Sequence, residues 1–130
     1  TMDGRSLVPF LRGEAPDDWR DYTYSELDFG DPVDPTIWQT RLGLDSDLTN
    51  FAILRGRRHT LVHFNGGLPP ILFDHEHEGE ACNVANDPAA SPILLEMTQR
   101  LLNHRLTHSE GRFARTMITA EGARRAPRVL

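Results

Sequence analysis

Short runs of alternating apolar and polar residues fill the first two thirds of the chain, and most of them end at glycine or proline. This is the pattern of half-buried strands. Residues 48–54 and 59–64 are rich in β-branched and aromatic side chains, and the glycine-bearing segment 55–58 reverses the chain between them. Residues 22–29 alternate in the same way, and residues 71–73 form a shorter run. The pattern predicts three or four antiparallel strands.

The last third of the chain carries one long helical pattern. Ser91 is the predicted cap and Pro92 the first helical residue. Apolar side chains then recur at helical spacing, at Ile93, Leu94, Met97, Leu101, Leu102 and Leu106. We therefore predict an α+β fold, in which a small three- to four-stranded antiparallel sheet is packed by one long C-terminal helix.

Two shorter apolar segments are predicted, the first helical or irregular and the second helical. Residues 7–11 form an apolar docking segment that ends at Gly13, and residues 37–42 form a short amphipathic helix. Asp34 is the predicted cap of the second segment, with Pro35 at its first helical position.

Beyond residue 108 the chain becomes polar and rich in arginine. We assign residues 1–110 to one domain and residues 111–130 to an arginine-rich C-terminal extension. Within this extension, residues 112–117 could add one more strand. Residues 121–130 are predicted to be a loose tail or an arm that grips a partner.

Charge is distributed unevenly along the chain. All 14 basic residues are arginine, so a lysine nucleophile is excluded. Residues 1–90 hold 16 acids and 7 arginines, a net charge of −9, whereas residues 91–130 hold 3 acids and 7 arginines, a net charge of +4. Nucleic-acid binding favours a basic stripe with interleaved aromatics, but the basic third has only Phe113. We expect this end to meet an acidic surface in the same assembly and not nucleic acid.

The chain shows no membrane or export signal. No apolar run approaches the roughly 18 residues of a membrane-spanning helix. The first five residues lack the basic and then apolar pattern of a secretion signal. We expect a soluble, cytoplasmic protein.

The segment 74–82 offers a candidate metal site. His75 and His77 lie two residues apart, so they could point the same way from an extended chain, and Cys82 or the acidic residues between could complete the ligands. The segment also follows a predicted strand and contains Gly79, which is typical of a solvated acidic turn. We favour the turn, and a small metal-binding domain using His75, His77 and Cys82 stays an alternative.

Three further pairs of titratable residues share one face of a predicted element: His104 and His108, His59 and His63, and Glu26 and Asp28. The first pair suits a helix C-terminus, where the helix dipole favours cationic histidine. The other two suit structural or exposed strand positions. Cys82 is the only cysteine, so an internal disulfide is excluded. We assign no catalytic, cofactor-binding or metal-ligating residue in this chain.

Several motifs occur in a fixed order along residues 3–106. They are Asp-Gly-Arg-Ser-Leu at 3–7, Trp-Arg-Asp at 19–21, His-Thr-Leu-Val-His-Phe at 59–64, Leu-Pro-Pro-Ile-Leu-Phe-Asp at 68–74, and Asn-Val-Ala at 83–85. In this order the chain resembles the C-terminal portion of the sulfatase branch of the alkaline phosphatase superfamily. Its phosphonate monoester hydrolase and phosphodiesterase-like members are the most similar. His75 departs from the family pattern, which has a hydrophobic residue after Leu-Phe-Asp.

The resemblance implies that the chemistry lies outside this chain. Such enzymes attack a sulfate, phosphate or phosphonate ester with a formylglycine made from Cys or Ser in a Cys/Ser-x-Pro-x-Arg motif, beside a divalent metal. Cys82 is followed by Asn-Val-Ala-Asn and lacks both the proline and the arginine. The resemblance therefore places the nucleophile and metal ligands in an upstream α/β domain, and we expect a segment of a longer protein.

The leading hypothesis is a non-catalytic C-terminal subdomain of a sulfatase-like hydrolase, inactive on its own. It would pack on the catalytic α/β domain, shape the substrate cleft through the loops 65–70 and 74–80, and contribute to the contacts of a homo-oligomer. The main alternative is a free-standing protein-interaction module that uses the apolar sheet face left uncovered by the helix.

Overall fold

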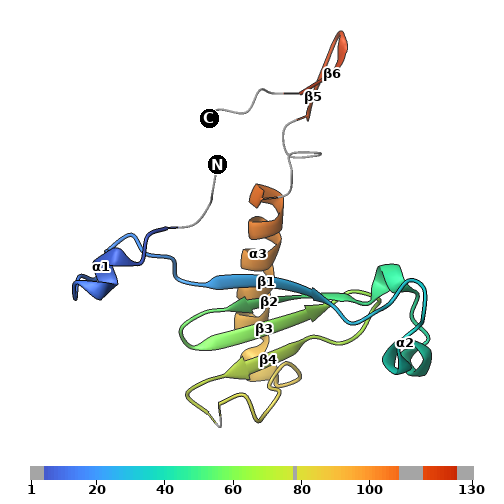
Figure 1. Ribbon diagram of the computed structural model, residues 1–130, viewed down its shortest axis with the longest axis horizontal. Coiled ribbons are helices and arrows are strands. Elements are labelled where there is room, and N and C mark those ends of the chain that lie inside the picture. Colours follow the sequence, from blue (N-terminus) through green and yellow to red (C-terminus); the bar gives the residue numbers. More distant parts are fainter. Residues whose placement is uncertain (1–4, 78, 109–115, 126–130) are drawn as a thin grey trace.

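A four-stranded antiparallel sheet forms the centre of the computed structural model, which describes residues 5–77, 79–108 and 116–125. Its strands follow chain order: β1 (Thr23–Asp28), β2 (Asn50–Arg55), β3 (His59–Phe64) and β4 (Ile71–Asp74). The long helix α3 (Ser91–His108) crosses one face of this sheet (Figure 1). The predicted α+β fold, a small antiparallel sheet packed by one long helix, is confirmed.

Short elements surround the sheet. They are α1 (Val8–Leu11), α2 (Ile37–Leu42) and the 3-10 turns η1 (Ser46–Leu48) and η2 (Pro88–Ala90). The predicted helix at 37–42 is thus confirmed, and the segment 7–11, expected to be helical or irregular, is helical over Val8–Leu11. Among the described residues, no helix is both long and apolar enough to cross a bilayer.

A separate hairpin lies beyond α3, made of β5 (Thr116–Thr119) and β6 (Gly122–Arg125). The expected loose tail over residues 121–130 is therefore wrong for residues 122–125, because their backbone pairs with β5. Gly122 has a φ of 108°, which permits the tight reversal. The extra strand expected at 112–117 overlaps the start of β5, and its residues 112–115 lie outside the described residues.

Two predicted helix caps are wrong by a few residues. Thr36, and not Asp34, caps α2: its Oγ1 accepts from the Gln39 backbone N–H at 3.2 Å, and Gln39 Oε1 accepts from the Thr36 N–H at 2.7 Å. This reciprocal pair satisfies two donors that the helix would otherwise leave free. The side chain of Asp87 caps η2, which runs directly into α3, so Ser91 already has helical dihedrals and is not a cap.

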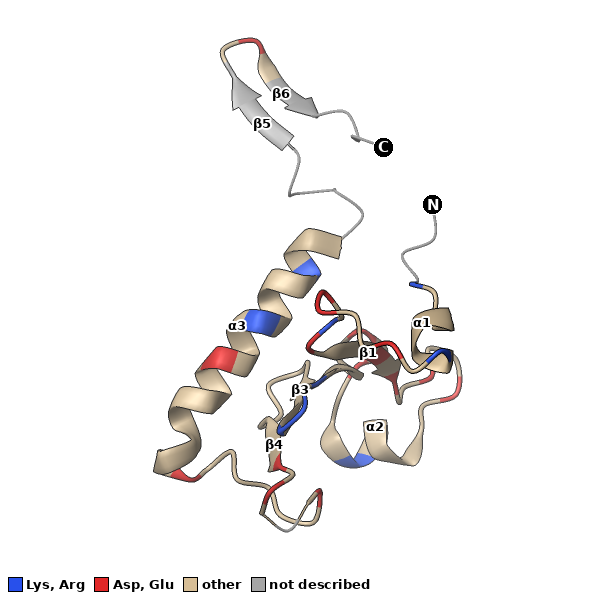
Figure 2. Ribbon diagram, turned by 90° about the vertical axis from the view of Figure 1, so that its left-hand side faces the viewer, with Lys and Arg blue, Asp and Glu red and all other residues tan. Residues whose placement is uncertain are grey.

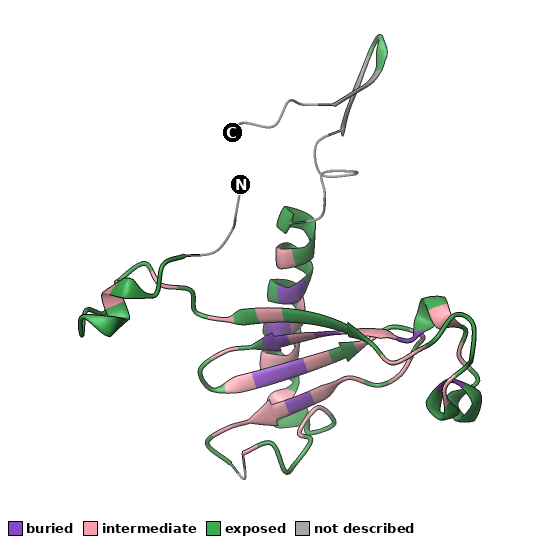
Figure 3. Ribbon diagram, in the orientation of Figure 1, coloured by how far each residue is buried: buried purple, intermediate pink, exposed green. Residues whose placement is uncertain are grey.

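The hydrophobic core lies between the sheet and α3 (Figure 3). Antiparallel register places alternate strand residues on the helix side, where they are buried against α3: Ala52, Leu54, Leu61 and Leu72 from the sheet, with Met97 and Leu101 from the helix. Because strand side chains alternate between faces, this arrangement directs every second residue to the other side of the sheet.

Candidate functional site

The sheet face opposite α3 is also apolar, and no described element lies across it. We call it the open face; it carries Leu27 of β1, Phe51 and Ile53 of β2, Val62 and Phe64 of β3, and Ile71 and Phe73 of β4. Figure 1 shows α3 behind the sheet and the front of the sheet clear, with α1 and α2 beyond opposite ends of the strands. Leu27 keeps 48% of its surface exposed, and the other six side chains are half-buried.

Aromatic rings on the open face shield one another in part. The ring centroids of Phe51 and Phe64 lie 5.4 Å apart, and Phe29 extends the row at 6.3 Å from Phe51. Such contacts are favourable, but they leave the outer surface of the rings without a partner. Contiguous apolar surface of this extent typically marks an interface.

The two short helices add apolar surface beside the open face. Figure 2 shows α1 and α2 on the side of the sheet away from α3. Their exposed hydrophobic side chains are Leu7, Val8, Phe10 and Leu11 around α1, and Ile37, Trp38 and Leu42 in α2. The open face and its two flanks form one side of the molecule that is rich in exposed or half-buried apolar side chains.

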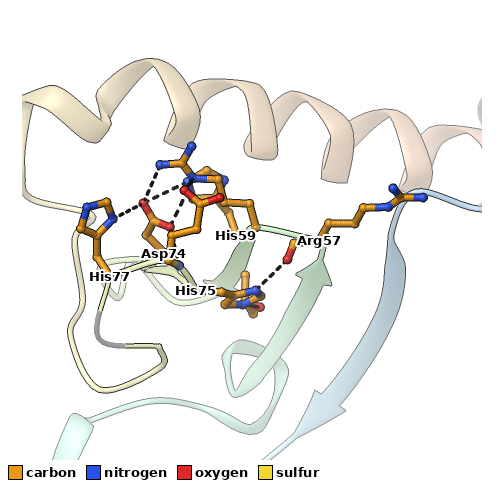
Figure 4. Close-up of polar contacts among 8 residues, drawn as sticks. Arg57, His59, Asp74, His75 and His77 are labelled. Atoms are coloured by element: carbon orange, nitrogen blue, oxygen red, sulfur yellow. Dashed lines mark hydrogen bonds and ion pairs between the residues drawn. The ribbon is translucent and has the colours of Figure 1, made fainter.

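A polar cluster fixes the turn after β4, and Asp74 lies at its centre (Figure 4). Asp74 accepts from Arg58 Nε at 3.3 Å and Nη2 at 3.2 Å, and from the Glu76 N–H at 3.0 Å. His77 Nδ1 lies 3.1 Å from the same carboxylate. The Arg58 guanidinium, followed by the other donors, holds the pKa of Asp74 far below its usual range. The cluster therefore ties the β4 turn to the β2–β3 turn through a carboxylate that stays charged.

The structure does not bring together the hypothesised metal ligands. His75 Nε2 lies 2.9 Å from Thr60 Oγ1 and its Nδ1 lies 3.1 Å from the Arg57 carbonyl, whereas His77 turns to Asp74. Figure 4 shows the two imidazoles pointing in different directions. Across residues 5–77, 79–108 and 116–125, no three His, Cys, Asp or Glu side chains gather as metal ligands. Each imidazole instead makes a contact that holds the turn.

The carboxylates of Glu26 and Asp28 are engaged by different partners. Glu26 accepts from the Tyr24 hydroxyl and pairs with Arg105 Nε of α3 at 3.4 Å, while Asp28 lies 2.6 Å from Thr49 Oγ1. Burial, and then the bond to Glu26, raise the pKa of Tyr24 to about 12. The pair thus links β1 to its neighbours and does not form an acid–base couple.

Histidines of α3 stack at the edge of the core. The rings of His104 and His108 lie 4.1 Å apart, and His104 also packs on Tyr24 at 4.2 Å. Burial and the neighbouring His108 lower the pKa of His104. Sequence spacing indicated the shared helix face but not the contact with Tyr24, which depends on where α3 crosses the sheet.

A hollow of about 540 Å³ lies beside β1, β2 and the second half of α3. Its lining includes Glu26, Asp28, His63, Asn65 and Arg105. His63 is the one of the predicted His59 and His63 pair that faces it, since His59 lies 3.7 Å from Asp74 at the other end of β3. Its lining holds no serine, threonine or cysteine side chain.

No protein-family model matches the chain. It is 36% identical over 109 residues to the multifunctional alkaline phosphatase superfamily protein PehA of Trinickia caryophylli, which covers 83% of this chain and 21% of that protein. The phosphonate monoester hydrolase of Silicibacter pomeroyi is 50% identical, with a TM-score of 0.78 over 95% of this chain and 24% of that one. The phosphonate monoester hydrolase of Agrobacterium radiobacter is 36% identical, with a TM-score of 0.73, and the match covers 98% of this chain and 25% of the Agrobacterium chain. A putative sulfatase from Bacteroides thetaiotaomicron is 30% identical, with a TM-score of 0.60 over 83% and 20% of the respective chains. The chain thus spans a fifth to a quarter of the length of these relatives.

Proposed function

This chain corresponds to a C-terminal portion of alkaline phosphatase superfamily proteins, and we propose that it is the non-catalytic subdomain of a sulfatase- or phosphonate monoester hydrolase-like enzyme. The motif-based resemblance is confirmed by relatives that carry these names. The proposed role of the chain is to pack on a catalytic α/β domain and to shape one side of its substrate cleft.

One observation carries this proposal: the open face is uncovered in a chain that spans only about a quarter of its relatives. A sheet that is apolar on both faces is typical of a middle layer, with packed elements on each side. Here α3 covers one side only. The catalytic domain would supply the other layer, with α1 and α2 contacting it at the two ends of the sheet.

The residues of this chain do not fit the family's nucleophile or metal. The exposed Cys82 lacks the proline and arginine of the formylglycine motif, and no described ligand cluster could hold a divalent ion. Both groups would therefore belong to the catalytic domain. The loops 65–70 and 74–80 are left with a shaping role. In the second loop, the Asp74 cluster ties residues 74–77 to the β2–β3 turn, and Glu80 pairs with Arg55 of β2.

The open face is tested by placing a charge in it. Leu27→Asp puts a carboxylate on the half-exposed edge of this face, so we expect reduced binding of a hydrophobic dye and reduced self-association of the isolated chain. Asn103→Asp, on α3 and so on the other side of the sheet, serves as the matched control. Dye binding that is equal in wild type, Leu27→Asp and Asn103→Asp would show that the open face is not an interface.

Complementation tests the role in the enzyme. The upstream region of the reading frame and this chain are produced separately, and hydrolysis of p-nitrophenyl phenylphosphonate and p-nitrophenyl sulfate is measured with divalent metal. We expect this chain alone to be inactive, and we expect it to raise the activity or the melting temperature of the upstream region. Leu27→Asp should weaken that effect. Hydrolysis by this chain alone would refute its non-catalytic role.

A further inference from the structure

The last two turns of α3 bury little of their surface. Leu101 is the last buried residue of the helix, and residues 102–108 are all exposed except His104, which is half-buried. Figure 3 shows this end of α3 extending past the edge strand β1. Packing against the rest of the fold supplies most of the stability of a helix. Attachment of residues 102–108 to the sheet therefore relies on His104 more than on any other side chain among them.

His104 packs against three rings. The centroid of its imidazole lies 4.2 Å from the ring of Tyr24 and 5.9 Å from the ring of Tyr22, which meets it edge-on. The ring of His108 stacks on it at 4.1 Å, with an angle of 22° between the planes. His108 is fixed in this position because its Nδ1 donates to the His104 carbonyl at 2.9 Å.

The acid that faces His104 already has partners. This acid is Glu26 of β1, whose carboxylate accepts from the Tyr24 hydroxyl and pairs with Arg105 Nε at 3.4 Å. Burial and the bond to Glu26 raise the pKa of Tyr24 to about 12, so this tyrosine stays neutral. A proton on His104 would therefore have to share a carboxylate that the arginine already neutralises.

The helix itself adds positive charge around the ring. Arg105 and His108 follow in the last turn, and a proton on His108 would place its charge 4.1 Å from the His104 ring. Arg100 lies one turn earlier and is paired with Glu96 at 2.9 Å. The helix dipole favours a cation at the very end of a helix, so it acts on His108 more than on His104. Burial, and then His108, lower the pKa of His104, and the nearby carboxylate opposes this only in part.

We propose that His104 is a pH-sensitive anchor: as a neutral ring it holds residues 102–108 on β1, and its protonation in mildly acidic solution releases them. A released imidazole is solvated and takes up a proton near the ordinary histidine pKa of about 6.5, whereas the packed ring resists it. Attachment is therefore complete above that pH and weakens as the pH falls below it. Release would also open the hollow of about 540 Å³, which Glu26 of β1 and Arg105 of α3 line together.

Hydrogen exchange of backbone amides tests the anchor in the 130-residue chain, without the catalytic domain. Protection factors, which correct for the direct effect of pH on exchange, are measured for residues 102–108 and 94–98 at about pH 7.5 and about pH 5.5. We expect the protection of 102–108 to fall several-fold relative to that of 94–98. The fall is limited to about ten-fold, because a released histidine with a pKa of about 6.5 is then roughly nine-tenths protonated.

Three matched substitutions to phenylalanine assign the effect. His104→Phe keeps a ring beside Tyr24 but cannot titrate, so protection of 102–108 should not change with pH. His108→Phe removes the neighbouring charge and should make the fall smaller. His63→Phe, at an exposed imidazole outside α3, should keep the wild-type response. The absence of a fall in wild type, or an equal fall in wild type and His104→Phe, would overturn the anchor.

A second measurement uses the wild-type chain alone. The ring signals of His104 and Tyr24 are followed by NMR from about pH 8 to about pH 5, and the midpoint for His104 should lie below the ordinary histidine value of about 6.5. The nuclear Overhauser contact between the two rings should weaken as His104 takes up its proton. A contact that persists at full strength after His104 is protonated would overturn the anchor, because the helix end would then stay on β1.

Discussion

Replacing Leu61 with alanine tests the core most directly. Leu61 has no exposed surface and lies at the centre of β3, with Leu54 and Leu72 beside it in register and α3 above it. Truncation removes three carbons from a site that three neighbouring elements enclose, namely β2, β4 and α3. Strand β3 is hydrogen-bonded to β2 on one side and to β4 on the other, so the cavity cannot collapse fully.

The expected loss is about 3–4 kcal/mol of unfolding free energy, within the range of roughly 2.7–5 kcal/mol found for fully buried leucines. A domain of ordinary size has about 5–15 kcal/mol of unfolding free energy in total, and the part of the chain that the structure describes has six buried hydrophobic residues. If the unfolding free energy decreases by about 2 kcal/mol per molar urea, the urea concentration at the unfolding midpoint should fall by roughly 1.5–2 M. Circular dichroism at 222 nm is the suitable signal because it reports α3.

Leu11→Ala is the control, because Leu11 is 85% exposed on α1. It should change the unfolding free energy by less than about 0.5 kcal/mol in the isolated chain. A loss below about 1 kcal/mol at Leu61, or an equal loss at Leu11, would contradict the assignment of the core to the layer between sheet and helix.

Two other substitutions address the polar contacts and the close packing. Asp74→Asn removes the charge that Arg58 holds. Folding lowers the pKa of Asp74, so the charged carboxylate stabilises the folded state above the ordinary carboxyl pKa of about 4, and this stabilisation is lost as the pH falls below that value. The unfolding midpoints of the variant and the wild type should therefore converge between pH 7 and pH 3. A difference that does not change with pH would contradict this. Gly30→Ala would place a Cβ 2.1 Å from the hydroxyl of buried Thr49 and should cost about 1–3 kcal/mol in a thermal melt. Gly56→Ala, whose nearest neighbour would be 3.5 Å away, should be tolerated, and equal losses would refute the packing argument.

Local patterns were sufficient to predict the elements, because each depends on neighbours in the chain. Alternation and β-branched content located β2 and β3 to within two residues, and helical spacing located α3. The caps were harder. Asp34-Pro35 and Ser91-Pro92 both look like helix starts, yet the reciprocal bonds of Thr36 with Gln39 and the earlier turn at Asp87 decide where the helices begin.

The metal hypothesis failed for a tertiary reason. Two histidines two residues apart share a side only in an extended chain, and residues 75–77 form a turn after β4. There, His75 is drawn to Thr60 and His77 to Asp74 because those partners lie on different sides of the turn. Thr60 lies 15 residues before His75 in the chain, so spacing alone could not indicate the outcome.

The sequence by itself determined the strand and helix segments, the α+β class, and, through ordered motifs, the likeness to a C-terminal portion of alkaline phosphatase superfamily proteins. Only the tertiary structure decided which apolar residues are buried within the chain. Leu61 and Phe64 have similar surroundings in sequence, but β3 turns one toward α3 and the other toward the open face. Leu101 and Leu102 are adjacent, yet one is buried and the other is exposed. The alternation of apolar and polar residues specifies that each strand has two faces. Which face is covered depends on where α3 packs, because the contact between α3 and the sheet joins residues that are far apart in the chain.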